Sequence, residues 1–422
     1  MTVTRRQVLA AGGATALGGL ALAAPWGAAE AAPPPLPAPS ASGIDHVIVV
    51  MMENRSFDHF AGWVPGADGR QAGLRFVDRY GIGHNTWHLR DFQGCSHPDP
   101  DHSYEGGRIE FNRGKCDGWL RAGENDPFAV GYYTAADLDF WRRASADWTV
   151  CDRYFAATMA ETYPNRFYQH AARTDRIHNS TATSSLPTIW DRLGAAGLRG
   201  RYYFSDVPFT ALWGTKYLPI SAPFPQFLAD CSSGNLPEVS FVDPRFTDEA
   251  SGTSGDDHPH GDVRSGEAFL AQVYNAVVTS PAWEGTLLVI TYDEWGGFYD
   301  HVAPQEAPDA DPSNALRGFR VPALVVSPRA RHGAVAHGVY DHTSVLRTIE
   351  WRWGLAPLTR RDARARNLAE VLDFGTPPRR RPPTYAVRPA PAGPPCQAAL
   401  VESSEEWAPL RDKAHAAGWT LP

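Results

Sequence analysis

The stretch that decides the fold is HVIVVMMENRSFDHF, residues 46–60. Its continuous apolar run, residues 47–52, predicts a strand buried on both faces, as in the centre of a parallel sheet. The run stops at Glu53 and Asn54, which carry side-chain oxygen atoms. In open α/β sheets, ligands bind just beyond the carboxyl ends of the strands, and such oxygens suit a hard cation. The alternative is that this pair only caps the next helix.

A second apolar run, LLVITY at residues 287–292, ends in the same way at Asp293 and Glu294. If the two strands are neighbours, four oxygen-bearing side chains meet at one edge of the sheet. A divalent cation would relieve the repulsion between them.

Strands and helices alternate along the rest of the chain. The expected strands are 149–155, 201–204, 239–242 and 321–327, and the expected helices are 135–146, 188–196, 265–278 and 341–353. This alternation predicts an α/β domain with a largely parallel sheet flanked by helices and irregular insertions. Residues 64–135 predict an elaborated insertion over the active face, and the proline-rich segment 205–237 is expected to be irregular.

Residues 1–31 have the features of a twin-arginine signal peptide. A pair of arginines, Arg5 and Arg6, precedes an apolar stretch at 9–24 and a small-x-small cleavage site at 29–31. We therefore expect export by the twin-arginine route to a secreted, periplasmic or cell-wall location. The alternative is a permanent N-terminal anchor. Elsewhere no stretch is long and apolar enough to span a membrane, so no transmembrane helix is expected in the mature form.

The remaining chain divides by composition. Residues 32–42 predict a flexible lead-in, 43–376 the main α/β domain, and 377–422 a Pro/Arg-rich linker with a C-terminal helix at 404–417. The net charge of −8 and the lack of a basic patch exclude nucleic-acid binding.

Five cysteines have no zinc-finger spacing and are disulfide candidates in an exported protein. Cys95 and Cys116 flank a polar insertion and form the first expected pair. Cys231 and Cys396 form the second. The odd count leaves at least one cysteine unpaired or bonded between chains.

The segment ETYPNRFY, residues 161–168, predicts a helix start, because Pro164 suits the first helical turn. A Thr162 hydroxyl there would lie near N–H groups that favour phosphate, and a metal ion would activate it as a nucleophile. The alternative is a plain N-cap threonine. Two histidines in polar loops, His102 and His258, are candidate acids or substrate contacts, with ordinary loop or core histidines as the alternative.

Several blocks in order resemble the bacterial phosphoesterase family, which holds phosphatidylcholine-hydrolysing phospholipases C and an acid phosphatase. The blocks are ENRSFDHFAG at 53–62, TYPNR at 162–166, TYDEWGGFYDHV at 291–302 and YDHTS at 340–344. The resemblance implies an alkaline-phosphatase-like α/β core. It implies a metal site made of Glu53, Asn54, Thr162, Asp293 and Glu294. It also implies catalytic roles for Thr162, His102 and His258. Three further residues are expected to support the ligands from behind: His301, Asp341 and His342. The divalent ion could be Zn, Ca, Mn or Fe.

The implied reaction is two in-line displacements through a phosphothreonine at Thr162, with His258 or His102 protonating the leaving alcohol. The expected substrate is a phosphate ester or phospholipid, cleaved as by a phospholipase C. The alternatives are an acid phosphatase and a non-catalytic metal-binding surface protein, against which the intact Thr162 argues. Long phospholipase C members carry C-terminal β domains that do not follow here, which puts both choline recognition and membrane engagement in doubt. Exposed tryptophans could still give transient contact with a lipid surface.

Overall fold

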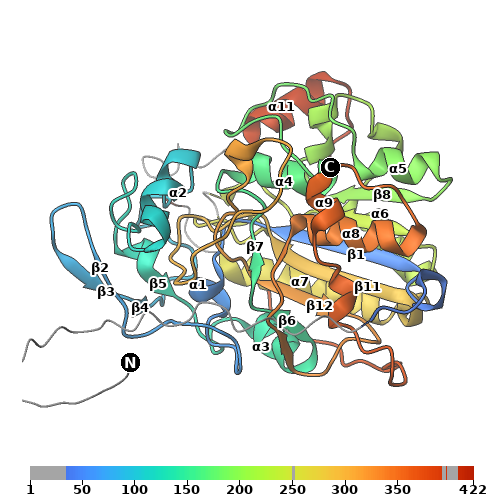
Figure 1. Ribbon diagram of the computed structural model, residues 1–422, viewed down its shortest axis with the longest axis horizontal. Coiled ribbons are helices and arrows are strands. Elements are labelled where there is room, and N and C mark those ends of the chain that lie inside the picture. The colour runs from blue at the N-terminus through green and yellow to red at the C-terminus, as the bar shows by residue number, and fades with distance from the viewer. Residues whose placement is uncertain (1–34, 250–251, 392–395, 397–406) are drawn as a thin grey trace, which may run out of the picture. The chain divides into compact units, whose positions relative to one another are not determined.

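The computed structural model describes residues 35–249, 252–391, 396 and 407–422 (Figure 1). The predicted signal peptide lies outside these ranges, as do residues 32–34 of the predicted lead-in. Within these ranges, every helix is too short or too polar to cross a bilayer.

The centre of the domain is an eight-stranded sheet in the order β13-β6-β12-β11-β1-β10-β8-β9. Its two central strands are the predicted ones, β1 (His46–Met52) and β11 (Thr286–Tyr292), which pair in parallel. The other strands are β6 (Thr149–Cys151), β8 (Gly200–Phe204), β9 (Ser221–Pro223), β10 (Val239–Val242), β12 (Ala323–Val326) and β13 (Ala334–Ala336). Only β12 runs antiparallel to its neighbours in this sheet. The mostly parallel sheet confirms the predicted α/β class.

Helices flank this sheet in two packed groups (Figure 1). In the first group, α7 (Val263–Val278) packs against α3 (Asp139–Asp147) and α6 (Phe224–Ser233). In the second group, α4 (Thr162–Ala171) packs against α5 (Ile189–Ala195) and α8 (His342–Trp353). The helix α8 also contacts α9 (Arg360–Arg364). The four helices expected before residue 354 are thus confirmed within a few residues. Their apolar faces supply much of the buried core.

Two local expectations were wrong. Residues 205–237 are not all irregular, since they contain β9 and α6. Proline sits in the first turn of α6, where it stabilises rather than breaks a helix, and Phe227 and Cys231 bury its inner face. The expected strand 149–155 is two strands, β6 and β7 (Tyr154–Phe155); β7 leaves the main sheet and pairs with β14 (Tyr340–Asp341).

The insertion 64–135 has short elements of its own. They are the hairpin β2 (Arg75–Val77) with β3 (Gly83–Asn85), the pair β4 (Trp87–His88) with β5 (Gly131–Tyr132), and the helix α2 (Tyr104–Phe111). A second hydrophobic cluster, including Phe76, Trp119, Trp295 and Tyr299, joins the insertion to the loop after β11. The insertion is therefore anchored next to the end of that strand.

The disulfide expectations were also wrong. Cys95 is bonded to Cys396, 301 residues away, whereas Cys116, Cys151 and Cys231 are free and buried. Cys116 packs in the second hydrophobic cluster and Cys231 in the main core, so neither reaches its expected partner. Disulfides require Cα atoms within about 7 Å, a condition that the fold, not the spacing along the chain, decides. The C-terminal helix α11 is described over Ala408–Ala416; residues 404–406 of the expected helix lie outside the described ranges.

Candidate active site

The carboxyl ends of β1 and β11 meet, as the two apolar runs predicted. The backbone N–H of Asn54 donates to Asp293 Oδ1 at 3.1 Å, and the N–H of Asp293 donates to the Met52 carbonyl at 3.0 Å. The side chains of Glu53, Asn54, Asp293 and Glu294 are all fully buried. Four oxygen-bearing side chains are thus gathered at one edge of the sheet.

The two loops approach so closely that one of them needs glycine. Asn54 has φ +60°, in the left-handed region that asparagine tolerates better than most residues. Gly296 has φ +62°, and a Cβ atom there would lie 2.1 Å from the Asn54 carbonyl oxygen. The glycine after Asp293-Glu294-Trp295 is therefore what lets the two acidic strand ends lie side by side.

Thr162 lies opposite Glu53. It is the first residue of α4, and Glu161 holds the N-cap position, so the interpretation of Thr162 as a plain N-cap residue is wrong. The Thr162 hydroxyl donates to Glu53 Oε2 at 3.3 Å, and both side chains are buried. A hydroxyl at a helix N-terminus is thereby directed at the acidic strand end.

Arg166, one turn further along α4, holds the other oxygen of Glu53. Its Nε donates to Glu53 Oε1 at 2.9 Å, and its Nη2 contacts the same oxygen. Its Nη1 donates to Asp243 Oδ1 at 3.2 Å, and Nε lies 3.8 Å from Asp293 Oδ2. Although burial opposes its charge, these carboxylates raise the pKa of Arg166. The arginine therefore fixes Glu53 so that Oε2 faces Thr162.

Glu294 accepts from the Gly296 N–H through Oε2 at 2.7 Å. Asn54 Oδ1 and Asp293 Oδ2 are buried and have no hydrogen-bond donor among the described residues. The Asn54 amide nitrogen lies 3.3 Å from His102 Nε2, which turns Oδ1 away from that histidine. Because buried acceptors are normally satisfied, these oxygens, Glu53 Oε2 and the Thr162 hydroxyl form a donor set that fits a hard divalent cation. The identity of the cation does not follow from the donors.

The two candidate histidines lie together beside this donor set, with ring centroids 6.4 Å apart. His102 belongs to the insertion, and its Nδ1 lies 2.8 Å from the Pro100 carbonyl. His258 is fully buried, and its Nδ1 lies 2.5 Å from Glu249 Oε2. Burial raises the pKa of Glu249 to about 8, against the opposing effect of His258. Glu249 was not singled out from the sequence, because nothing nearby in the chain signals its partner.

The three residues expected behind the ligands have different surroundings. His342 lies with Nε2 2.6 Å from the Asp293 carbonyl, and burial lowers its pKa to about 4, so the neutral ring supports that loop. Asp341 instead caps α8 and pairs with Arg317 at 2.7 Å and Arg361 at 3.0 Å. Burial opposes ionisation of Asp341, yet the two arginines lower its pKa.

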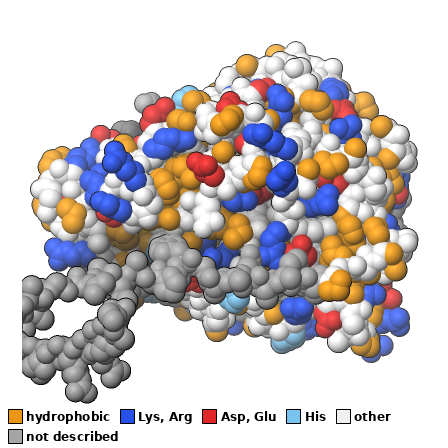
Figure 2. All heavy atoms as spheres, in the orientation of Figure 1, with side chains coloured by type: hydrophobic (Ala, Val, Ile, Leu, Met, Phe, Trp, Pro, Cys, Tyr) orange, Lys and Arg blue, Asp and Glu red, His pale blue; other side chains and the backbone are white. Residues whose placement is uncertain are grey.

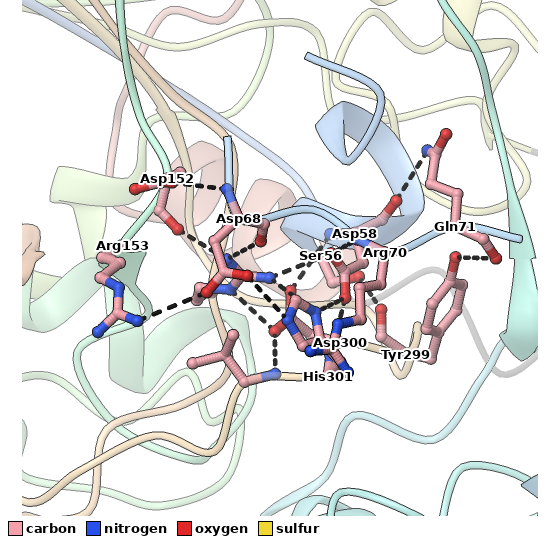
Figure 3. Close-up of polar contacts among 12 residues, drawn as sticks. Ser56, Asp58, Asp68, Arg70, Gln71, Asp152, Arg153, Tyr299, Asp300 and His301 are labelled. Carbon is pink, nitrogen blue, oxygen red and sulfur yellow. Dashed lines mark hydrogen bonds and ion pairs between the residues drawn. The ribbon is translucent and has the colours of Figure 1, made fainter. Parts of the chain in front are cut away.

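His301 belongs to a separate network of polar contacts (Figure 3). Its Nδ1 lies 2.5 Å from Asp58 Oδ2 and its Nε2 3.2 Å from Asp68 Oδ1. Asp58, Asp300 and His301 have the types and spacing of metal ligands. However, Arg320 already donates to Asp300 Oδ1 at 2.9 Å and to Asp58 Oδ1 at 3.1 Å. The guanidinium thus supplies the positive charge there, and the network ties the loop after β1 to the loop after β11.

Comparison with known proteins agrees with the sequence blocks. The model of the Phosphoesterase family matches residues 44–356. Phospholipase C B of Mycobacterium tuberculosis is 30% identical over 459 residues, covering 89% of this chain and 87% of the relative. Non-specific phospholipase C4 of Arabidopsis thaliana is 29% identical over 403 residues, covering 81% and 74%.

Solved structures show only a distant likeness. A phosphonate monoester hydrolase of Agrobacterium radiobacter is 12% identical, with a TM-score of 0.40 over 79% of this chain and 78% of that one. An alkaline phosphatase superfamily protein of Vibrio parahaemolyticus is 10% identical, with a TM-score of 0.38 over 87% and 94%. The fold description therefore stands on the sheet itself. By the family match over most of its length, the chain belongs to the phosphoesterase family.

Proposed function

We propose that this phosphoric ester hydrolase is a metal-dependent, phospholipase C-like phosphodiesterase that works through a phosphothreonine at Thr162. The observation that carries the proposal is the buried contact of 3.3 Å between the Thr162 hydroxyl and Glu53 Oε2, at a helix N-terminus facing the acidic strand ends. The names of the phospholipase C relatives favour the diester class. The twin-arginine pattern in residues 1–31 supports export as part of the same proposal.

In the first step, the Thr162 oxygen attacks phosphorus in line with the leaving alcohol. Glu53 Oε2 accepts the hydrogen bond of the hydroxyl and takes its proton as the O–P bond forms, while Arg166 keeps Glu53 in place. The N–H groups of the first turn of α4 favour a phosphoryl group at this position. A divalent cation held by Glu53, Asn54 and Asp293 would supply positive charge that lowers the hydroxyl pKa and neutralises the phosphoryl oxygens.

The leaving alcohol needs a proton, and His258 is the candidate donor. The His258 Nδ1 lies 2.5 Å from Glu249 Oε2, so we assign the proton transfer to the alcohol to the other nitrogen, Nε2. In the second step, water attacks the phosphothreonine and returns a proton to the same nitrogen. The Thr162 oxygen leaves phosphorus and takes back its proton from Glu53, which restores Thr162 and releases the phosphomonoester. His102 instead accepts from the Asn54 amide through Nε2, a position suited to orienting Asn54.

The test compares the wild-type protein with Thr162→Ala and Thr162→Ser, using phosphatidylcholine, a bis-aryl phosphodiester and an aryl phosphomonoester, with metal analysis of each sample. Thr162→Ala should lose at least about 10³-fold in kcat, because no nucleophile remains, whereas Thr162→Ser should keep measurable turnover. Thr210→Ala is the matched control, since Thr210 is a fully buried threonine outside the site. Near wild-type turnover by metal-replete Thr162→Ala would refute the proposal, and a preference for the monoester would favour an acid phosphatase.

A further inference from the structure

Large apolar side chains that face solvent gather in one short part of the insertion. Among the described residues, four of the six exposed large apolar side chains lie between positions 77 and 87: Val77 (43% exposed), Tyr80 (80%), Ile82 (59%) and Trp87 (37%). The first three lie on the β2–β3 hairpin and Trp87 lies just after it. Scattered apolar residues on a surface need no explanation, but a contiguous group usually marks a site of interaction.

The turn of this hairpin is held in one conformation by Asp78. Its Oδ1 accepts from the N–H groups of Tyr80 and Ile82 at 2.9 and 2.8 Å, and its Oδ2 lies 2.8 Å from His84 Nε2. Gly81, between the two apolar residues, has φ +82°. The backbone of this turn is therefore fixed although its largest side chains remain exposed. Both oxygens of the Asp78 carboxylate make their contacts within the hairpin.

The hairpin is tied to the loops that carry the site. Phe76 is buried, and its ring centroid lies 5.8 Å from that of Tyr299, in the loop that follows Asp293 and Glu294. His102 belongs to the same insertion. Figure 1 shows the hairpin projecting from the end of the domain towards which β1 runs, so it extends from the same end as the candidate active site.

The charge of this segment is opposite to that of the whole chain. Residues 72–90 contain three arginines, Arg75, Arg79 and Arg90, and one acidic residue, Asp78, whereas the chain carries −8. All three arginines are exposed, and Arg79 also pairs with the exposed Glu124 at 3.4 Å. Figure 2 shows Lys and Arg side chains gathered over this end of the molecule. Exposed aromatic and aliphatic side chains flanked by arginines match the headgroup region of a bilayer, where the rings sit at the boundary and the cations meet phosphate.

We propose that the β2–β3 hairpin docks the protein on a phospholipid bilayer, with Tyr80 and Ile82 entering the boundary between headgroups and acyl chains and Arg75 and Arg79 lying against lipid phosphates. A stable protein interface needs about 800 Å² per partner, more than the tip of a narrow hairpin offers, whereas a few side chains suffice for reversible membrane contact. The choice of a phospholipid partner rests on the proposed function. The hairpin would bring the site to its substrate at the lipid surface.

The direct test is flotation of the full chain with vesicles of phosphatidylcholine, with and without an anionic phospholipid. Tyr80→Ser/Ile82→Ser should lower the vesicle partition coefficient by about tenfold or more, since both side chains leave the boundary region. Arg75→Gln/Arg79→Gln should lose binding mainly on the anionic vesicles and at low salt. The matched control is Leu218→Ser, which removes an exposed apolar side chain outside the insertion (37% exposed) and should bind as wild type.

Binding by Tyr80→Ser/Ile82→Ser equal to wild type would overturn the proposal, as would an equal loss in Leu218→Ser. Gel filtration is run on the same samples. If the wild type is a dimer and Tyr80→Ser/Ile82→Ser dissociates it, the hairpin binds a second copy of the chain, and the proposal of membrane docking is overturned. In a hydrolysis assay, the hairpin variant should lose turnover of vesicle phosphatidylcholine and keep turnover of a soluble bis-aryl diester. If the wild type cleaves neither substrate, the proposed function fails, while flotation still decides the docking.

Discussion

Replacing Arg166 with methionine should lower the free energy of unfolding of the metal-free protein by about 3–5 kcal/mol, the usual cost of removing one partner from a buried ion pair. Arg166 is 2% exposed, lies between Glu53 and Asp243, and is close to Asp293. Methionine keeps much of the volume that packs against Phe246. The loss therefore reports mainly the carboxylates left without a cation.

The same change should make the protein more dependent on metal. If Glu53 and Asp293 bind a divalent cation, that cation replaces part of the lost positive charge, so added metal should stabilise Arg166→Met more than wild type, by on the order of 1 kcal/mol. Arg361→Met is the matched control. Arg361 is 1% exposed and also joins two buried carboxylates, Asp309 and Asp341, away from the strand ends. It should lose similar stability with no change in metal response.

Chemical denaturation followed by tryptophan fluorescence, in chelator and in added metal, measures both quantities for the three proteins. A loss of less than about 1 kcal/mol in metal-free Arg166→Met would refute the assignment of Arg166 as the residue that neutralises the strand ends. An equal gain in metal response by both variants would refute the location of the cation.

Two other perturbations test separate parts of the structure. Glu249→Gln should reduce turnover of phosphatidylcholine by about 10²-fold but that of a nitrophenyl diester only a few-fold, because His258 matters most for a poor leaving group; equal losses would contradict its role in positioning. Burial, with a contribution from Asp362, raises the pKa of Glu350 from 4.5 to about 9. Between these pH values the folded state keeps a proton that the unfolded state loses, so the free energy of unfolding falls as pH rises. Glu350→Gln should therefore gain more stability over wild type at pH 8 than at pH 5 in chemical denaturation, and a difference independent of pH would contradict this account.

Much of the fold follows from the sequence because its central strands are buried on both faces. The run at 239–242 coincides with β10, and the runs at 47–52 and 287–292 lie in β1 and β11, which are neighbours in parallel. The antiparallel direction of β12 was not predicted, since a short apolar run does not encode its direction. The helix α6 was missed because prolines and aromatic residues at its start resemble a loop.

The candidate site was predicted as far as it lies at strand ends and at the start of a helix. Glu53, Asn54, Asp293 and Thr162 come together because the two strands are adjacent and α4 begins beside them; their roles in binding and catalysis stay predictions. The carboxylate behind His258 could not be assigned, because both residues lie in one irregular loop with no periodic pattern to predict their contact. The neutralising arginine could not be assigned either, because its contacts with Glu53 and Asp243 depend on the packing of distant segments. The same reason explains the wrong disulfide pairs.

The configuration at phosphorus tests the phosphothreonine most directly. The measurement is the hydrolysis, in isotopically labelled water, of a phosphodiester made chiral at phosphorus by sulfur substitution, followed by analysis of the product configuration. Attack by Thr162 and then by water gives two in-line inversions, so the account predicts overall retention. Overall inversion would show a single direct attack by water and would contradict a covalent intermediate on Thr162.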